Sequence, residues 1–294
     1  MDRTVFLDRI QNGILLFDGA IGTQLQARGL KMGEVPEQWN LVNPDAVRGV
    51  HSDYVKAGAD VITTNSFGGS RYKLEKSGLS SDFRTINIRA ARLAKEAAGE
   101  SVLVAGSVGP TGEFLEPLGM VKPEAMRDVF QEQIEALVEG GADLIIIETM
   151  MALDEAGLAV EAARSAGVFP VIASMTFELG KQGYRTMMGI DIPTAVNGLI
   201  EKGADVVGSN CGNGIDGFVD LVKTMRGVTN IPLIAEANAG LPQLIEGRTV
   251  YNETPEIMAR KLPALIKAGA NIVGGCCGTT PEHIQRFREI VQRL

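Results

Sequence analysis

The sequence contains only three cysteines and two histidines among 294 residues, and aromatic residues make up 5% of it. An odd number of cysteines in a chain of this length does not fit a framework of disulfide bonds, which is typical of small secreted proteins. Basic residues are also few, 28 against 36 acidic residues, and they form no cluster. The net charge of −8 therefore argues against a groove for nucleic acid or a surface for anionic membranes.

Long apolar runs are missing as well. No run approaches the roughly 20 apolar residues that are needed to cross a bilayer. The first ten residues, MDRTVFLDRI, include four charged side chains and therefore lack the apolar centre of a signal peptide. These absences predict a cytoplasmic protein with no nucleic-acid partner and no membrane partner.

Four segments repeat one pattern, in which Gly-Ala-Asp or Gly-Ala-Asn precedes an apolar run. They are residues 56–65, 139–149, 201–211 and 267–277. The glycine suits the left-handed residue that ends a helix, and the apolar run suits a buried strand. Upstream of each lies a helical pattern, as in residues 125–140, where apolar residues recur at spacings of three and four.

Four further apolar runs alternate with these four. They are residues 13–19, 101–109, 169–177 and 231–238. The runs are apolar throughout, as is typical of parallel strands that are covered on both faces. Eight strands, each followed by a helix-length segment, predict an α/β fold of the (β/α)8 TIM-barrel type, in a single domain over residues 1–294. A doubly wound open sheet is the alternative, because the number of strands does not prove closure.

Polar or metal-binding side chains stand at nearly every carboxyl end of the eight predicted strands, where the active site of such a barrel lies. They are Asp18, Asn65, Ser107, Glu148, Thr176, Cys211, Asn238 and the pair Cys276 and Cys277. All three cysteines of the chain are therefore expected on the functional face.

The cysteines admit three interpretations. They are three small buried apolar side chains, a disulfide between the neighbours Cys276 and Cys277, or a metal site. The disulfide requires a strained ring and leaves Cys211 unexplained. The shared face favours the metal site, and so do the glycines on both sides of the pair, which leave room around the thiols.

Three converging thiolates predict a zinc site with an open position, because a catalytic zinc keeps one position for water or substrate. The histidines are weak candidates for a fourth ligand. His51 and His283 both fall in predicted helices, where we expect them to face solvent. Zn²⁺ with three thiolates has a net charge of about −1, which suits it to holding a further thiol as thiolate. The chemistry predicted from these residues is alkyl transfer to a substrate sulfur.

Seven stretches, in order along the whole chain, make the sequence resemble the homocysteine S-methyltransferase family, and most of all the homocysteine-binding modules of cobalamin-dependent methionine synthases. They are LLFDGAIGTQLQ (15–26), ADVITTNSFG (59–68), GSVGPTG (106–112), IIIETM (145–150), GSNCGNG (208–214), AEANAG (235–240) and GGCCGTTPEHI (274–284). The resemblance implies that Cys211, Cys276 and Cys277 bind one zinc ion and that homocysteine sulfur takes its open position.

The resemblance also implies how the substrate is held. Asp18 and Glu148 would bind the amino group of homocysteine, and the amides of the turn formed by Gly19, Ala20 and Ile21 would receive its carboxylate. A helix N-cap is the alternative role for Asp18, and a structural ion pair is the alternative for Glu148.

Three further side chains follow from the same resemblance. Asn238 would offer an exchangeable fourth ligand to zinc when homocysteine is absent, although an asparagine in a turn is also an ordinary hydrogen-bonding residue. Asn65 and Ser107, together with Thr64, are expected to line the substrate pocket.

The resemblance leaves the methyl donor open. The folate, cobalamin and reactivation modules of the cobalamin-dependent enzymes are not present in this chain, so a corrinoid protein or a cobalamin domain would present methylcobalamin, which the chain itself would not bind stably. S-methylmethionine and betaine are the alternative donors. The low aromatic content argues against betaine, whose quaternary ammonium favours aromatic faces.

Two other functions fit the residues less well. One is a metal-free lyase or aldolase with Lys56 or Lys202 as nucleophile, although both lysines precede their strands and lie at the opposite face. The other is a non-catalytic zinc module that serves as a docking platform, which leaves the open metal position without a purpose.

Overall fold

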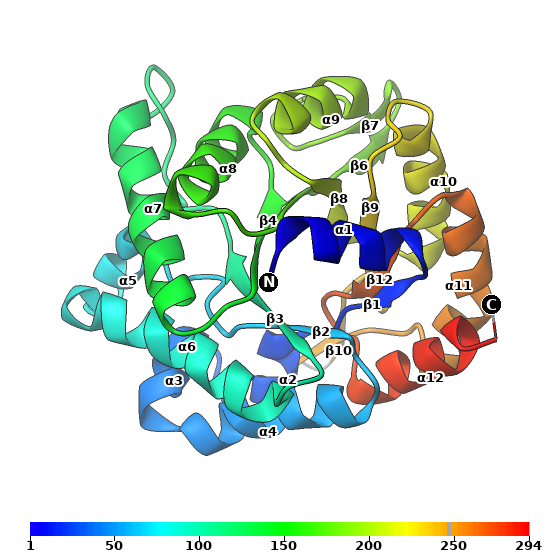
Figure 1. Ribbon diagram of the computed structural model, residues 1–294, viewed down its shortest axis with the longest axis horizontal. Helices are drawn as coiled ribbons and strands as arrows, with labels where there is room; N and C mark the ends of the chain where they lie inside the picture. Colours follow the sequence, from blue (N-terminus) through cyan, green and yellow to red (C-terminus); the bar gives the residue numbers. More distant parts are fainter. Residues whose placement is uncertain (246–247, 294) are drawn as a thin grey trace.

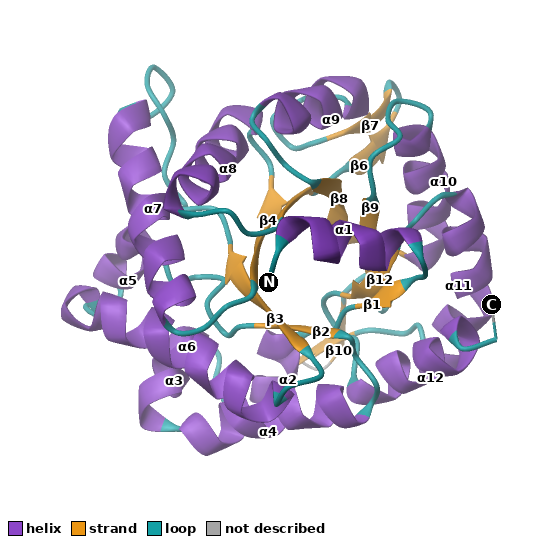
Figure 2. Ribbon diagram, viewed as in Figure 1, coloured by secondary structure: helices purple, strands orange, loops and turns teal. Residues whose placement is uncertain are grey.

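A computed structural model describes residues 1–245 and 248–293. Eight parallel strands form the central sheet, and helices surround it (Figures 1 and 2). The strands are β1 (Leu15–Leu16), β2 (Val61–Thr63), β3 (Leu103–Val108), β4 (Leu144–Met150), β5 (Val171–Met175), β8 (Val206–Gly214), β9 (Leu233–Asn238) and β12 (Ile272–Gly275). The main helices that follow them in turn are α4 (Pro44–Lys56), α6 (Phe83–Ala98), α7 (Pro123–Glu139), α8 (Leu153–Ala166), α9 (Ile192–Glu201), α10 (Ile215–Arg226), α11 (Pro255–Ala268) and α12 (Pro281–Val291).

The sheet closes into a barrel. Its strand order is β1-β12-β9-β8-β5-β4-β3-β2, and a parallel bridge between Phe17 and Val61 joins the two ends of that order. The amide of Asp60 also donates to the carbonyl of Leu16 at 2.7 Å. The predicted (β/α)8 barrel is therefore confirmed, and the open doubly wound sheet is wrong.

Helix α1 (Arg3–Gln11) covers the amino-terminal end of the barrel and crosses in front of the strands in Figure 1. Phe6 and Ile10, one helical turn apart, are 0% and 2% exposed. They pack with the inward-facing residues of the strands, among them Leu15 and Ile146. Burial of these two side chains contributes about 3 to 6 kcal/mol, so α1 is part of the barrel core.

Shorter elements occupy the segments between barrel strands and main helices, at the carboxyl end of the barrel. They are α2 (Ile21–Ala27), η1 (Pro36–Gln38), α3 (Trp39–Val42), α5 (Arg71–Lys76), η2 (Ser80–Asp82), the hairpin of β6 (Glu178–Gly180) and β7 (Gly183–Arg185), and the hairpin of β10 (Gln243–Ile245) and β11 (Arg248–Val250). Within the described residues, no helix has both the length and the apolarity needed to cross a membrane.

The fourfold Gly-Ala-Asp/Asn repeat has a clear structural meaning. Its glycines have φ values of +95°, +103°, +104° and +120°, at Gly58, Gly141, Gly203 and Gly269. The left-handed helix ends predicted from the sequence are therefore confirmed. A residue with a side chain is strained in this conformation, so each glycine allows the chain to leave a helix and enter the next strand.

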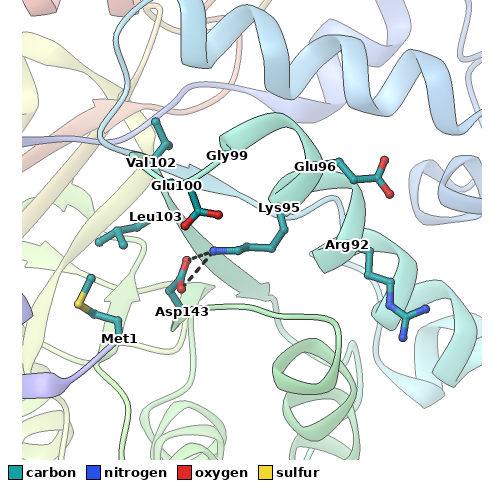
Figure 3. A pocket seen from close by; sticks show the side chains of 9 residues that line it. All are labelled: Met1, Arg92, Lys95, Glu96, Gly99, Glu100, Val102, Leu103 and Asp143. Atoms are coloured by element: carbon teal, nitrogen blue, oxygen red, sulfur yellow. Dashed lines mark hydrogen bonds and ion pairs between the residues drawn. The ribbon is translucent and has the colours of Figure 1, made fainter.

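The third residue of each Gly-Ala-Asp/Asn repeat anchors a neighbouring strand. Its side-chain oxygen accepts a hydrogen bond of 2.8–3.0 Å from a strand amide: Asp60 from Leu16, Asp143 from Val104, Asp205 from Val171 and Asn271 from Leu233. A cationic side chain from an adjacent helix contacts each of them: Arg288, Lys95, Arg164 and Arg226 respectively. Figure 3 shows one such pair, in which Lys95 Nζ lies 3.0 Å from Asp143 Oδ2.

An anchor of the same kind also joins the two ends of the chain. Arg288 belongs to α12, the last helix, and it pairs with Asp60 at the start of β2 at 2.6 Å. Arg288 thus plays at Asp60 the part that Lys95, Arg164 and Arg226 play in the other three repeats, and Arg9 of α1 lies 3.7 Å from the same carboxylate. The anchors all lie at the amino ends of the strands, which leaves the carboxyl ends free for a site.

Candidate active site

A cavity of about 720 Å³ opens at the carboxyl ends of the strands. Seven of the strand-end residues singled out from the sequence line it: Asp18, Asn65, Ser107, Glu148, Cys211, Cys276 and Cys277. Thr176 and Asn238 lie beside it, both at least nine-tenths buried. The barrel therefore brings together residues that are as much as 259 positions apart in the sequence (Asp18 and Cys277).

The three cysteines form a compact cluster that could hold a metal ion. All three are free thiols, and their Sγ atoms lie within 4.8 Å of one another. Cys211 Sγ and Cys277 Sγ are 4.0 Å apart. Tetrahedral Zn–S bonds of about 2.3 Å would put two sulfurs about 3.8 Å apart, so the spacing suits a single ion of this kind.

The backbone around Cys276 and Cys277 explains the glycines beside them. Cys276 N donates to the carbonyl of Ala237 at 2.9 Å, which ties the pair to β9. Gly278 has φ +82°, and a Cβ there would lie 2.2 Å from the ring of Tyr251. The chain can turn sharply after the two thiols only because this position is glycine.

Asn238 has a side-chain oxygen without a partner. Among the described residues, its buried Oδ1 atom has no hydrogen bond. A hydrogen bond from the Asn238 side chain contributes to lowering the pKa of Cys211, so the two groups are neighbours. A buried oxygen without a partner is costly, and a cation at the thiols would relieve that cost, so the donor set fits a metal ion.

The three thiols shift one another's pKa values through mutual hydrogen bonds. Hydrogen bonds from Cys276 and Cys277 are the main cause that lowers the pKa of Cys211, to about 2. Their hydrogen bonds to Cys211 are in turn the first cause that raises the pKa of Cys276 well above its usual value and that of Cys277 to about 11. A divalent cation at the cluster would favour ionisation of all three thiols.

The carboxyl groups of Asp18 and Glu148 lie in the same cavity. Asp18 accepts hydrogen bonds from Thr63 N at 2.8 Å and from Thr63 Oγ1 at 3.2 Å. Glu148 accepts one from Ser107 Oγ at 2.6 Å. Burial raises the pKa of Asp18 well above its usual value and that of Glu148 to about 7, against the lowering effect of these hydrogen bonds.

A third carboxyl group, that of Glu236, was not predicted from the sequence. Glu236 is 4% exposed and lines the cavity. Burial raises its pKa well above the usual value, and the charges of Glu148 and Asp18 add to this effect. The signal was present, because side chains two positions apart on a strand share a face, and Glu236 is two positions from Asn238.

The cavity has no basic side chain to balance these acids. Among the described residues that line it there is no lysine, arginine or histidine. Four acidic residues line it, the three above and Glu37, together with the three thiols. An electronegative cavity of this kind favours cationic ligands, such as an ammonium group or a metal ion.

The turn after β1 is held firmly in place. Ala20 N donates to Thr279 Oγ1 at 3.1 Å, and Tyr54 Oη donates to the Ala20 carbonyl at 2.9 Å. A Cβ on Gly19 would lie 2.6 Å from Thr279 Oγ1, so only glycine fits there. The Ala20 amide, expected to receive a substrate carboxylate, is thus already paired with Thr279 in the free protein.

Asn65 and Ser107 also have partners within the protein. Asn65 Nδ2 donates to the carbonyl of Pro36 at 2.7 Å and to Asn40 Oδ1 at 3.0 Å. Ser107 Oγ donates to Glu148 Oε1 at 2.6 Å, and Ser107 N donates to Thr64 Oγ1 at 2.9 Å. The side chains of Ser107 and Asn65 therefore face the cavity as fixed groups rather than as mobile ones.

The prediction that both histidines face solvent is wrong. His51 is 0% exposed, and burial lowers its pKa to about 4. His283 is 4% exposed and forms a capping box with Thr280, while its Nε2 contacts the Glu253 carbonyl at 2.9 Å. Neither histidine joins the thiol cluster.

The lysines considered as nucleophiles are remote from the cavity. Lys56 pairs with Asp53, and Lys202 pairs with Glu161 at 2.5 Å. Neither lysine is among the residues that line the cavity with the thiols. This placement argues against a lyase that forms a covalent bond through either of them.

Comparison with known proteins agrees with this geometry. A family model described as homocysteine S-methyltransferase matches residues 15–291. The methionine synthases of Mycobacterium tuberculosis (strain ATCC 25618 / H37Rv) and Mycobacterium leprae (strain TN) are 31% and 30% identical to the chain. The matches cover 99% of this chain but 26% and 25% of those proteins, so the chain spans about a quarter of their length.

A solved structure is similar over the whole chain. The metallated form of the homocysteine methyltransferase MmuM from Escherichia coli superposes with a TM-score of 0.80 at 27% sequence identity. The match covers 94% of this chain and 96% of that one.

Proposed function

Because the chain belongs to the homocysteine S-methyltransferase family, we propose that it transfers a methyl group to the thiol of L-homocysteine and so forms methionine. One observation supports this function best. Three free thiols converge beside an unpartnered amide oxygen, in a cavity whose other charged groups are carboxyls. The three thiols and the amide oxygen suit a thiol-binding metal ion, and the carboxyl groups suit the ammonium of an amino acid.

Zinc is the metal that we propose, held by Cys211, Cys276 and Cys277, with Asn238 as an exchangeable fourth ligand. When bound, zinc supplies a positive centre that lowers the pKa of a substrate thiol, so that the sulfur is nucleophilic at neutral pH. The single unpaired oxygen of Asn238 supports its assignment, because a ligand that must leave for substrate has no other hydrogen bond to hold it.

Protein side chains would hold the rest of the substrate. Asp18 and Glu148 would receive the ammonium, and Ser107 would keep the Glu148 carboxylate in place through its 2.6 Å hydrogen bond. The turn of Gly19 and Ala20 would receive the carboxylate, once the Ala20 amide is shared with or released by Thr279. The volume of about 720 Å³ exceeds what one amino acid fills and leaves an opening for the donor.

A methylcorrinoid, methylcobalamin on a separate protein or domain, is the donor that we propose. Most of the exposed large apolar side chains lie in the segments after β1, β2, β3, β5 and β9, at the end of the barrel where the cavity opens. They are Met32, Phe67, Phe114, Leu118, Met120, Leu179, Met187, Met188, Leu241, Leu244 and Val250. Exposed apolar surface at a cavity mouth is typical of a docking site for a macromolecule, and a small donor would not need it.

S-methylmethionine is the second candidate donor, with betaine as a further alternative. The E. coli homocysteine methyltransferase is of similar length, since the match covers 96% of it. A chain of that length is thus compatible with a donor that needs no further domain.

We also propose that residues 1–294 act as one homocysteine-binding zinc methyltransferase domain, because strands from both ends of the chain pair in one barrel. Three thiols that must stay reduced suit a reducing compartment, so the cytoplasm is the location that we propose.

Zinc content and proton release together test the function. The wild type is expected to bind about one zinc per chain and to release a proton when homocysteine is added. Cys211→Ser is expected to lose most of this zinc. Ser209→Ala, on the same strand, is the control, because the buried Ser209 Oγ has no partner among the described residues.

Each other outcome contradicts the proposal in a different way. Zinc without any response to homocysteine would indicate a non-catalytic docking module, and a protein without zinc would favour the metal-free lyase. A donor screen with methylcobalamin, S-methylmethionine and betaine then decides the donor. Turnover with S-methylmethionine alone would refute the corrinoid and leave the remaining assignments intact.

A further inference from the structure

Asn210 is a buried residue in the middle of β8, next to Cys211, and the function proposed above does not use it. Its side chain is 0% exposed. Its side-chain amide contacts four residues, which are Glu148 and Thr149 of β4, Ser174 of β5, and Cys276, which directly follows β12. It therefore lies where the thiol cluster meets the carboxyl group of Glu148.

Two donors fix the orientation of the Asn210 amide. Its Oδ1 atom accepts hydrogen bonds from Thr149 N and from Ser174 Oγ, both at 2.8 Å. A backbone N–H can only donate, so Oδ1 and not Nδ2 must face Thr149 N. The two N–H groups of Nδ2 consequently point away from β5.

The N–H groups connect the two halves of the site. Nδ2 donates to Thr149 Oγ1 at 2.7 Å. The other N–H is shared between Cys276 Sγ, 3.8 Å from Nδ2, and Glu148 Oε2, 3.5 Å from Nδ2. One amide thus contacts a thiol of the metal cluster and the carboxylate that would bind the substrate ammonium.

Backbone strain also concentrates around Asn210. Among the described residues, Thr149 and Cys211 are the non-glycine residues with positive φ, at 60° and 64°. Thr149 is bonded to Asn210 by both its N and its Oγ1, and Cys211 is the next residue along the chain. Such strained conformations persist only where the surroundings hold them, and they gather at functional sites.

We propose that Asn210 is a positioning residue that holds the Cys276 thiolate and the Glu148 carboxylate in a fixed relation. It thereby sets the distance between the place of the substrate sulfur and the place of the substrate ammonium. The inference rests on the proposed function for the identity of the substrate, but the contact with Cys276 does not depend on it. Groups that orient metal ligands in this way change affinity by about 10- to 100-fold when they are removed.

Two variants test the proposal. Asn210→Ala removes all of the amide contacts without changing the charge. Ser174→Ala removes one of the two donors that orient the amide, and Ser174 does not line the cavity. Asn87→Ala is the matched control, because Asn87 is also 0% exposed and its Nδ2 donates to two carbonyls at 2.9 Å, remote from the thiols.

Homocysteine affinity is the first measurement, made by calorimetry on the zinc-loaded proteins. Asn210→Ala is expected to raise the Kd for homocysteine about 10-fold or more, and Ser174→Ala to raise it by a smaller factor. For 4-mercaptobutanoate, which has the thiol and the carboxylate of homocysteine but no ammonium, both variants are expected to change the Kd much less than they change it for homocysteine. Asn87→Ala is expected to lower the thermal midpoint and leave the homocysteine Kd unchanged.

The absorption spectrum of the cobalt(II)-loaded protein is the second measurement, and it requires no substrate. A sulfur that loses an N–H donor gives up its electrons more easily, so the sulfur-to-cobalt charge-transfer band of Asn210→Ala is expected to move to longer wavelength. A wild type that does not respond to homocysteine would refute the proposed function, and the cobalt spectrum would still decide whether Asn210 acts on the metal site.

Three results would overturn the inference. The first is an equal loss of affinity for homocysteine and for 4-mercaptobutanoate in Asn210→Ala. The second is a charge-transfer band that does not move. The third result applies if Asn210→Ala cannot be purified. In that case, a Ser174→Ala protein that binds homocysteine with the same Kd as the wild type would overturn the inference.

Discussion

Replacement of Glu148 by glutamine keeps the shape of the side chain and removes its charge. Glu148 accepts the hydrogen bond from Ser107 Oγ at 2.6 Å, and no basic side chain is present among the described residues that line the cavity. The substrate ammonium that we propose here would therefore depend on Glu148 and its neighbour Asp18 for charge compensation. Glu148→Gln removes one of these two carboxylates.

The size of the effect follows from the surroundings of Glu148. Removing one partner of a buried, hydrogen-bonded charge pair costs about 2 to 5 kcal/mol. The side chain is partly open to the cavity, and retained water places the expected cost in the lower part of this range, about 2 to 3.5 kcal/mol. Since 1.4 kcal/mol corresponds to a factor of ten, the Kd for homocysteine is expected to rise about 30- to 300-fold.

Calorimetric titration of zinc-loaded protein with homocysteine at pH 8 measures this change. Glu155→Gln is the matched control, because Glu155 is also buried and accepts a hydrogen bond from a hydroxyl, Thr111 Oγ1, at 2.7 Å, but does not line the cavity. The control is expected to leave the Kd unchanged. A Glu148→Gln protein that keeps its zinc and binds homocysteine within about threefold of the wild type would refute the assignment of Glu148.

Two further predictions concern pH and stability. The pKa of Glu148 is raised to about 7 by burial, and an ammonium binds only the charged form, so homocysteine affinity should increase as pH rises from 6 to 8. This step should be missing in Glu148→Gln, and a step of equal size in that variant would contradict the role of Glu148. Asp205→Ala removes the anchor that Arg3, Arg164 and Val171 N share, which should lower the free energy of unfolding in urea by about 3 to 5 kcal/mol. Asp216→Ala, which breaks an exposed pair with Lys261, should cost less than about 1 kcal/mol, and equal losses in the two variants would show that the anchor is unimportant.

The sequence predicts the barrel well because its strands and turns repeat. The Gly-Ala-Asp/Asn pattern occurs four times, and the positive φ of all four glycines confirms the helix ends that it predicts. The carboxyl ends of the strands lie within three residues of the ends of the apolar runs. Because parallel strands bring their carboxyl ends to one face, the positions of the cysteines, Asp18 and Glu148 could also be predicted.

Other features of the site depend on contacts between elements, which the pattern within a single strand or helix does not predict. Glu236 falls within an apolar run, so it was assigned to the buried strand and was not predicted as a site residue, although it lines the cavity. His51 was expected in solvent, yet Val47, Val50, His51 and Tyr54 form one buried face of α4 at helical spacing. That spacing would have predicted the burial. Tyr251 lies next to the thiols because it directly follows the hairpin strand β11. The hairpin strands show no regular alternation of apolar and polar residues, so the sequence does not predict them.

The anchors at the amino ends and the chemical groups at the carboxyl ends lie on the same strands. Glu148 follows the anchor Asp143 by five residues, Cys211 follows Asp205 by six, and Cys276 follows Asn271 by five. A shift of one residue in strand register would move a side chain by about 3.3 Å and turn it to the other face. The metal ligands that we propose would tolerate displacements of only about 0.2 Å, so these anchors would serve the proposed site as well as the stability of the barrel. Removal of one anchor should therefore weaken zinc binding under conditions in which the barrel is still folded.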